Sequence, residues 1–475
     1  MEWETVLGLE VHAELATASK IFCSCTTAFG GEPNTHCCPI CMGMPGTLPV
    51  LNRKALEYAV KAAVALGCEI TRYTTFDRKN YFYPDLPKAY QISQLYLPFA
   101  RGGHVRLENG RTVRIHEIHL EEDAGKLIHS PQEGKTYPDY NRCGIPLIEI
   151  VSEPDFRCAE DVLSYLEYLK AVLQDLGVSD VKMEEGSLRA DVNLSVRPAG
   201  REELGTRTEM KNLNSFKAIE RAIASESARQ IEILESGKAV VQETRRWDDK
   251  EGKSFGMRTK EEACDYRYFP DPDLPPLEIS DDFIERIRRT QPELAHERKA
   301  RYMAQFHLGG QEAALLAKNK TYAGIFEKTV AVCRDPKEVA AWITGELLYI
   351  VNARGLDESA LEINAEKLAE IIQMVKCGRI NRPTGKQLFQ KLAAEPDLEP
   401  EAYIREHNLL QIDDPDVIRR EVADVLKSHP DSVAEYKHGK EKVYAYFFGQ
   451  TMKRLHGKAN PAAVNTIIAE ELSNI

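Results

Sequence analysis

The stretch Val6–Leu15, with the sequence VLGLEVHAEL, restricts the possible folds of this chain more than any other feature. Its period-two pattern predicts a half-buried β-strand with Leu7, Leu9, Val11 and Ala13 on one face and Gly8, Glu10, His12 and Glu14 on the other. Side chains on one strand face are roughly 6.5–7 Å apart, which lets carboxylates converge on one divalent cation. A solvated sheet face has the same pattern, and the strand alone favours that interpretation.

The size and charge of the chain exclude some classes of protein. Its 475 residues predict two to four domains. A net charge of −12 argues against a general, sequence-blind nucleic-acid binder but leaves room for a local basic site. The acidic N-terminus, MEWETVLGLE, is typical of a strand rather than of a targeting peptide, and no apolar run approaches the length of a membrane span. We therefore expect a cytoplasmic protein without a membrane partner.

The pattern of the chain changes near residue 280. Before it, short alternating strands and turns dominate, with helices predicted at 56–66 and 162–176. The proline-dense DPDLPPLEI near Pro270–Pro276 cannot continue a helix or a central strand. After it, helical periodicity dominates, for example in a stripe at 368–375 that Gly378 would end. The sequence thus predicts an α+β fold with a mixed-sheet body, a helical middle and a small helical tail.

Five of the eleven cysteines lie between Cys23 and Cys41. Within this stretch, a Cys-Ser-Cys turn and a Cys-Pro-Ile-Cys turn are separated by twelve residues. Two such turns can supply four thiolates to a tetrahedral zinc ion, and four protein ligands leave no open position for catalysis. The sequence therefore predicts a structural zinc site formed by Cys23, Cys25, Cys38 and Cys41, and Cys37 is a surplus candidate ligand.

Several later segments also combine apolar alternation with charged side chains. They are SLRADVNLSVR with Arg189, Asp191 and Asn193; GTRTEMKNLNSF with Arg207, Glu209 and Lys211; HLEEDAGK with Glu121–Asp123; and FDRKNYFYPDLPKAYQISQ with Lys79, Tyr81, Tyr83 and Lys88. Together they indicate a pocket where carboxylates hold a metal and cations hold phosphates. The sequence has no GxxxxGK[ST] loop, GxGxxG motif or GxSxG elbow, so a nucleotide site would require an unusual fold.

The segment Lys427–Lys458 carries a local excess of positive charge. Seven basic residues face three acidic ones, and Tyr436, Tyr444, Tyr446, Phe447 and Phe448 lie between them. Such a patch suits RNA phosphates. A solvated helix face over an aromatic core explains the same composition equally well.

The motifs named above occur together with LIEIVSEPDFR, QETRRWD, DYRYFPDPDLP and the GKANP near Lys458. In this order and over the full length, the sequence closely resembles the family of aspartyl/glutamyl-tRNA amidotransferase B subunits. The resemblance implies three domains, a cradle at 1–292, a helical domain at 293–398 and a tRNA-binding tail at 399–475.

The resemblance also implies a function. B subunits use ATP and magnesium to phosphorylate the side-chain carboxylate of glutamyl-tRNA or aspartyl-tRNA, and ammonia then displaces phosphate to give the amide. The A subunit, an amidase, supplies the ammonia from glutamine, and a small C subunit ties A and B together. The phosphorylation fits the sequence, because transfer between two anions requires a metal and cations.

Carried over by position, the magnesium ligands would be Glu10, His12, Glu122 and Glu209. Imidazole is an unusual magnesium ligand. The choice of Glu122 over Glu121 follows from the resemblance and not from the strand pattern. Contacts to the nucleotide and the acyl phosphate are expected from Lys79, Tyr81 and Arg189, with Asp191 and Asn193 in support.

Three other functions compete with this interpretation. The first is a non-catalytic, zinc-containing tRNA-binding adaptor. The second is a cysteine-dependent glutaminase, for which no cysteine has a recognisable nucleophile context. The third is the related archaeal E subunit, whose large inserted domain has no room in a chain with an uninterrupted series of cradle motifs.

Overall fold

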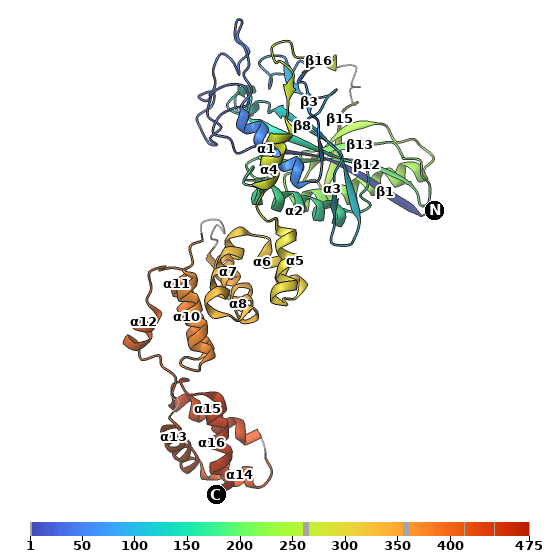
Figure 1. The fold of residues 1–475 in the computed structure, drawn as a ribbon. Coiled ribbons are helices and arrows are strands. Elements are labelled where there is room, and N and C mark those ends of the chain that lie inside the picture. The colour runs from blue at the N-terminus through green and yellow to red at the C-terminus, as the bar shows by residue number, and fades with distance from the viewer. Residues whose placement is uncertain (1, 260–265, 355–360, 413, 441, 475) are drawn as a thin grey trace. The chain divides into compact units, whose positions relative to one another are not determined.

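The computed structural model describes residues 2–259, 266–354, 361–412, 414–440 and 442–474. The chain divides into two compact units, Met1–Leu294 and Ala295–Ile475. The first contains the sheets and the second is helical, which confirms the predicted α+β class (Figure 1).

In the described part of the first unit, ten strands form one mixed sheet, with β13 and β14 parallel and the other pairs antiparallel. Its order is β15 (Lys253–Thr259), β14 (Glu243–Asp248), β13 (Thr208–Lys211), β12 (Leu188–Pro198), β1 (Trp3–Glu14), β11 (Pro146–Ser152), β8 (Thr112–Glu122), β6 (Ala100–Arg101) and β2 (Glu69–Ile70), with β7 (His104–Arg106) beside β8.

Seven shorter strands form separate small sheets. They are β3 (Tyr73–Thr74) with β17 (Leu277–Glu278), β4 (Asp77–Asn80) with β5 (Tyr90–Ser93) and β16 (Phe269–Pro270), and β9 (Lys126–Ser130) with β10 (Lys135–Asp139). Both β16 and β17 lie at the proline-dense segment, where chain breaks were predicted and only two-residue strands form.

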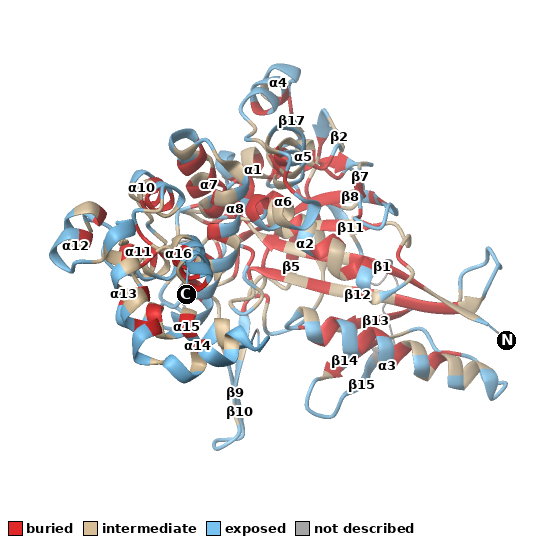
Figure 2. Cartoon of the chain, turned by 90° about the horizontal axis from the view of Figure 1, so that it is seen from below, coloured by how far each residue is buried: buried red, intermediate tan, exposed pale blue. Residues whose placement is uncertain are grey.

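The strand predicted at Val6–Leu15 is β1, and it lies in the interior of the large sheet. Its alternation is confirmed, because Leu7, Leu9, Val11 and Ala13 are at most 1% exposed in the core. Figure 2 shows this sheet with largely buried strands. Buried residues of α2 (Ala159–Asp175) and α3 (Phe216–Glu235) belong to the same core. With one face covered in this way, Glu10 and His12 project from the opposite face.

The helices predicted at 56–66 and 162–176 correspond to α1 (Arg53–Ala65) and α2. The start of α1 is fixed by Asn52, whose side chain accepts a hydrogen bond from the Lys54 amide. The last helix of this unit is α4 (Asp281–Arg289).

The described residues of the second unit form two hydrophobic clusters. The first involves α5 (Ala295–Phe306), α6 (Gly310–Ala317), α7 (Lys320–Cys333), α8 (Pro336–Trp342), a π-helical turn (Ile343–Leu347), α9 (Leu348–Arg354), α10 (Ala365–Lys376), α11 (Arg382–Leu392) and α12 (Pro400–Glu406). The second involves α13 (Pro415–Ser428), α14 (Pro430–Lys437), α15 (Lys442–Arg454) and α16 (Pro461–Asn474).

The predicted stop at Gly378 is confirmed, because this glycine follows the last residues of α10 with a φ of +72°. The three-domain division stays a prediction. One detail bears on its last boundary, because Ile404 of α12 packs in the first cluster. None of the helices within the described ranges is both long and apolar enough to cross a membrane.

Candidate active site

The polar face of β1 opens into a cavity of about 950 Å³. Its lining includes most of the residues selected from the sequence: Glu10, His12, Lys79, Tyr81, Tyr83, Arg189, Asp191, Arg207, Glu209 and Lys211. A cavity of this volume can enclose a nucleotide-sized ligand. The charged faces of these strands therefore line one cavity, as their sequences indicated.

Strand pairing explains why these side chains converge. Across β1, Glu10 pairs with Asp191 of β12, and His12 pairs with Glu149 of β11 and with Arg189 of β12. Paired residues of neighbouring strands point to the same face of a sheet. The interior position of β1 thus gathers charged residues from both sides.

Two groups of potential metal ligands lie on this face. In the first, the Nε2 atom of His12 is 3.7 Å from Glu121 Oε1 and 3.8 Å from Glu149 Oε2. The second consists of Glu10, Asp191 and Glu209. In each group the donor atoms lie within 4.8 Å of one another, close enough to share one cation. The residues Glu10, His12 and Glu209 that were selected from the sequence therefore divide between two groups.

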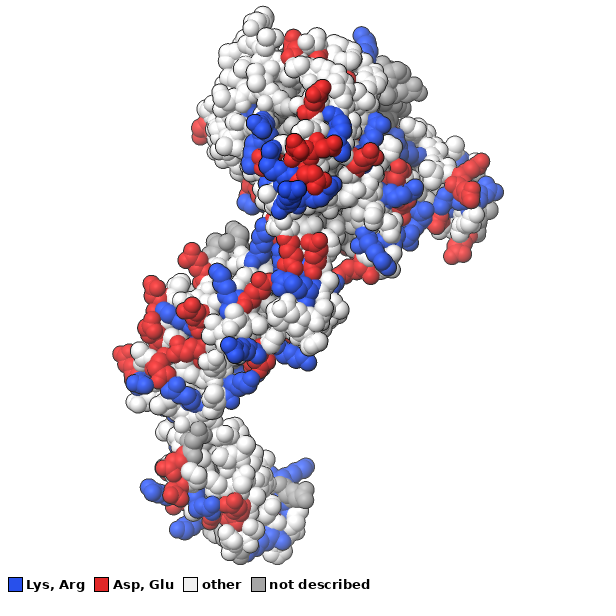
Figure 3. Space-filling view, in the orientation of Figure 1, with Lys and Arg blue, Asp and Glu red and all other residues white. Residues whose placement is uncertain are grey.

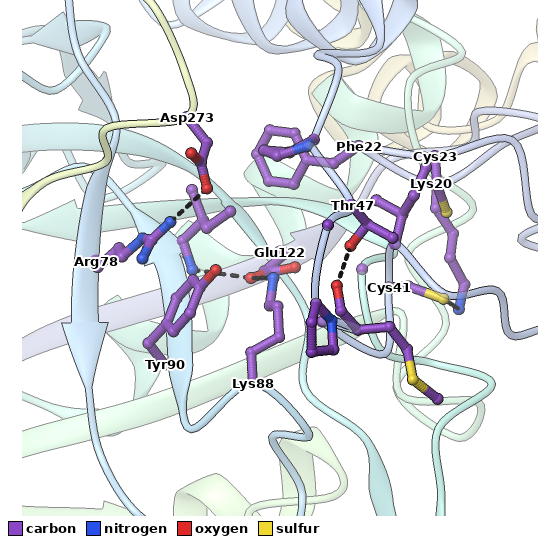
Figure 4. Close-up of a pocket in the computed structure, with 18 residues that line it drawn as sticks. Lys20, Phe22, Cys23, Cys41, Thr47, Arg78, Lys88, Tyr90, Glu122 and Asp273 are labelled. Atoms are coloured by element: carbon purple, nitrogen blue, oxygen red, sulfur yellow. Dashed lines mark hydrogen bonds and ion pairs between the residues drawn. The ribbon is translucent and has the colours of Figure 1, made fainter.

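Glu122 is not brought together with these residues. In β8, Glu121 pairs with Leu147 and Glu122 pairs with Pro146, so the two adjacent carboxylates point to opposite faces. Glu122 forms an ion pair with Lys88 and accepts a hydrogen bond of 2.9 Å from the Ile92 amide. These residues line a smaller cavity of about 220 Å³ (Figure 4). Glu121 occupies the position beside His12 that the resemblance assigned to Glu122.

Glu149 and His119 were not selected from the sequence. His119 Nδ1 is 3.8 Å from Glu149, and His119 Nε2 is 2.9 Å from Glu117, so these residues form a chain behind the first group. The signal for Glu149 is a single carboxylate inside the apolar strand PLIEIVS, whose other side chains are mostly buried. A lone acid in such a strand is costly unless it is paired or binds a cation.

Lys79 is the cation that faces the first group. Its ammonium lies 4.9 Å from the centre of the Tyr266 ring. Burial lowers the pKa of Lys79, but Tyr268, Glu121 and Glu149 outweigh this effect and raise it. Lys79 is therefore positively charged at neutral pH and placed at the cavity wall. Tyr81 stands at the same wall, with its ring 6.3 Å from that of Tyr266.

Lys211 is the cation of the second group. It forms an ion pair with Asp191 and lies 3.2 Å from Glu209 Oε1. Asn193 donates a hydrogen bond of 2.9 Å to Glu10, while its own Oδ1 atom is buried and accepts no hydrogen bond from the part of the chain that the structure describes. Such an orphaned acceptor at the edge of an acidic group fits a site that takes a further ligand.

Arg189 is held in a fixed orientation. Its guanidinium donates two hydrogen bonds, of 2.8 and 3.0 Å, to the carboxylate of Asp123. Glu14, to which no role was assigned, lies 4.0 Å from Arg189. Burial, followed by the charge of Asp123, raises the pKa of Glu14 to about 8. Arg189 thus lines the cavity while Asp123 and Glu14 hold its guanidinium in place.

The four cysteines predicted to bind zinc do come together. Their sulfur atoms lie within 4.8 Å of one another, and Cys38 Sγ and Cys41 Sγ are 3.9 Å apart. Tetrahedral coordination at a Zn–S distance of about 2.3 Å requires sulfur separations of roughly 3.8 Å. The cluster could therefore hold zinc. The surplus Cys37 lies outside it, with its sulfur 3.9 Å from Asn141 Oδ1.

Comparison with known proteins gives family matches in both units. Residues 5–285 match the family model of the GatB/GatE catalytic domain, and residues 324–472 match that of the GatB domain. The chain is 55% identical over 474 residues to the B subunit of the aspartyl/glutamyl-tRNA(Asn/Gln) amidotransferase of Lachnoclostridium phytofermentans, covering 99% of each chain. It is 54% identical to that of Caldicellulosiruptor bescii and 50% identical to that of Brevibacillus brevis, covering 100% of each chain in both cases.

The two adjacent glutamates of β8 provide a test of the cavity as a metal site. Replacing Glu121 by Gln removes a negative ligand beside His12, so we expect manganese binding to weaken by roughly 10–100-fold or more. The matched variant Glu122→Gln changes the opposite face and should leave manganese affinity unchanged. Titration followed by electron paramagnetic resonance measures both. The reverse ranking of the two variants would refute the assignment.

Proposed function

Because the chain belongs to the family of aspartyl/glutamyl-tRNA(Asn/Gln) amidotransferase B subunits, we propose that its large cavity activates the amino acid of a misacylated tRNA. Membership makes the chain a subunit of a ligase. The substrates of this proposal are ATP and glutamyl-tRNA(Gln), aspartyl-tRNA(Asn) or both. The observation that carries it is the gathering of two acidic groups and several fixed cations on one face of the sheet.

The proposed reaction has two steps. In the first, a side-chain carboxylate oxygen of the charged amino acid attacks the γ-phosphorus of ATP, and ADP leaves. In the second, ammonia attacks the carbonyl carbon of the acyl phosphate, phosphate leaves with the bonding electrons, and a proton departs from the nitrogen. The first step is required because a carboxylate on its own has no adequate leaving group.

The first step brings two anions together, and the residues of the cavity reduce the repulsion. The resemblance implies magnesium, which when bound would shield phosphate charge and orient the phosphates. His12, Glu121 and Glu149 would hold one such ion, and Glu10, Asp191 and Glu209 would hold another. A cation compensates part of the charge of each group, Lys79 at the first and Lys211 at the second.

Lys79, Arg189 and Lys211 supply positive charge that requires little reorganisation. Lys79 is held over an aromatic ring, and Arg189 is fixed by Asp123. We assign Lys79 and Arg189 to the phosphates, with Tyr81 beside them. Asp191 forms an ion pair with Lys211 and Asn193 donates a hydrogen bond to Glu10, so we assign both residues to positioning these groups. Preorganised charges of this kind stabilise a transition state better than mobile ones do.

The ammonia would come from partner subunits. We propose an amidase A subunit that releases it from glutamine and a small C subunit that joins A and B. The four-cysteine cluster would hold a structural zinc ion, because four thiolates leave no position for a substrate.

A non-catalytic adaptor is the alternative function. It requires zinc and RNA contacts but gives no reason for a large cavity that combines two acidic groups with fixed cations. The two functions differ in one measurable respect, since an adaptor would release no phosphate from ATP in the presence of charged tRNA.

The variant Glu10→Ala tests the proposed catalysis. We expect acyl-phosphate formation to fall by more than the roughly 10–100-fold that loss of an outer-shell partner costs at a metal site. Glutaminase activity of the reassembled complex should persist, because that reaction belongs to the A subunit. Quenched-flow detection of labelled phosphate on charged tRNA measures the first quantity.

The control for this experiment is Glu220→Ala, which removes an exposed carboxylate from α3. It should behave as the unmodified complex does. Normal transamidation by the Glu10→Ala complex would rule out the metal role of this residue.

The C-terminal helices are the proposed tRNA-binding part. Phe447 is buried, and Tyr436, Tyr444 and Phe448 pack against the same core, so these aromatics serve packing first. Lys427, Lys442 and Lys453 are exposed, and Figure 3 shows basic side chains beside acidic ones on the visible surface of this part. Tyr446 is exposed, so the proposal for RNA depends mainly on the lysines and, for stacking, on this one ring of the five.

Replacing Lys427, Lys442 and Lys453 together by Gln tests this surface. The slope of log K against log salt is negative, and each lost phosphate contact reduces its magnitude by roughly 1. We therefore expect the magnitude to fall by roughly 3 and tRNA binding to weaken. Filter binding at several salt concentrations gives both values. The matched triple variant of the exposed Lys217, Lys238 and Lys250 in the first unit should retain the original slope. Equal slopes for the two triple variants would contradict a role of the tail in binding.

A further inference from the structure

Lys20 is completely buried in the first unit, next to the four-cysteine cluster. Its ammonium nitrogen lies 3.7 Å from Cys41 Sγ (Figure 4). It also lies 3.4 Å from the carbonyl oxygen of Tyr140. Across the described ranges, no carboxylate forms an ion pair with it. A buried ammonium is costly unless an anion compensates it, so this position requires an explanation.

Glu122 shares the smaller cavity with Lys20 but forms no ion pair with it among the described residues. Its Oε1 atom instead pairs with Lys88 and accepts a hydrogen bond from the Ile92 amide. In Figure 4, Lys88 points to Glu122, whereas Lys20 points to Cys41. The potential anion that Lys20 contacts is therefore the Cys41 sulfur.

The sulfur of Cys41 is contacted by two donors. Its sulfur accepts a hydrogen bond of 3.1 Å from the Cys38 backbone amide and the contact from Lys20. Zinc with four thiolates carries a formal charge of two minus. A closed site of this charge inside a protein is stabilised by donors and cations that contact its sulfurs.

We propose that Lys20 is the counter-cation of the zinc site, a positioning residue that makes a doubly negative centre stable in a buried environment. This inference depends on the proposed zinc site and assigns a role to a residue outside its ligand set. The positive charge of Lys20 is the required property, and its hydrogen bond to Tyr140 is secondary.

Further contacts connect the surroundings of Lys20 to the large cavity. The segment after Tyr140 carries Arg142, whose Nε donates a hydrogen bond of 2.9 Å to the Ala124 carbonyl and lies 3.4 Å from Asp123. Asp123 in turn anchors Arg189 in the large cavity. Lys20 therefore contacts both the proposed zinc centre and the segment that supports a phosphate-binding arginine.

The test measures zinc retention by the purified full-length chain. A chromogenic chelator reports the rate and the amount of zinc release from the unmodified chain, Lys20→Met, Lys20→Gln and Lys20→Arg. Gln keeps a hydrogen-bond donor without charge, whereas Arg keeps the charge. The adjoining cavity of about 220 Å³ gives room for the larger arginine side chain. The exposed Lys238→Met serves as the matched control.

We expect Lys20→Met and Lys20→Gln to bind zinc roughly 10–100-fold more weakly, the range found for residues that contact metal ligands. Lys20→Arg and Lys238→Met should retain zinc as the unmodified chain does. Cobalt substitution adds a second readout, since the charge-transfer bands of a four-thiolate centre should appear in every variant, but at higher cobalt concentration for Met and Gln. Circular dichroism verifies that each variant is folded.

Unchanged zinc affinity of folded Lys20→Met would overturn the inference, as would equal losses in the Arg, Gln and Met variants. If the unmodified chain takes up neither zinc nor cobalt, the zinc site itself is wrong, and that result is distinct from a failure of the role of Lys20.

Discussion

The antiparallel pairing of β1 with both β11 and β12 is the interaction on which the rest of the site depends. An interior strand with one apolar and one charged face has a single stable register, since a shift of one residue would bury its carboxylates in the core. The core below β1 fixes that register through Leu7, Leu9 and Val11. Glu10 and His12 are consequently held on the cavity side, and side chains of neighbouring strands are brought to them.

The same constraint explains the electrostatics of the cavity. Carboxylates of five strands are held close together by backbone hydrogen bonds and cannot move apart, while Lys79 and Lys211 compensate only part of their charge. A rigid excess of carboxylates with cations at its edge favours a divalent ion together with a phosphorylated ligand. This arrangement is the physical basis for assigning the activation of a carboxylate to this face of the sheet.

Much of this could be predicted from the sequence because it depends on local periodicity. The alternation of β1, the positions of α1 and α2 and the end of α10 at Gly378 follow from patterns within single segments. The shared pocket of Lys79, Tyr81, Arg189 and Asp191 follows only from several charged segments taken together and from the family resemblance. The orientation of Glu121 and Glu122 could not be predicted, because three consecutive acids do not show which of them faces which side of the sheet. Only the pairing with Leu147 and Pro146 sets it. Glu149 stands out in the sequence as a lone acid in an apolar strand, but its partners, like those of Lys20, are distant in the sequence, so the pattern does not identify their contacts.

Anomalous scattering from crystals grown with manganese and a non-hydrolysable ATP analogue would test the central claim most directly. The account predicts a manganese peak bounded by His12, Glu121 and Glu149, with the phosphates directed toward Lys79 and Arg189. Manganese beside Glu122 in the smaller cavity, or phosphates bound away from the charged face of β1, would contradict it.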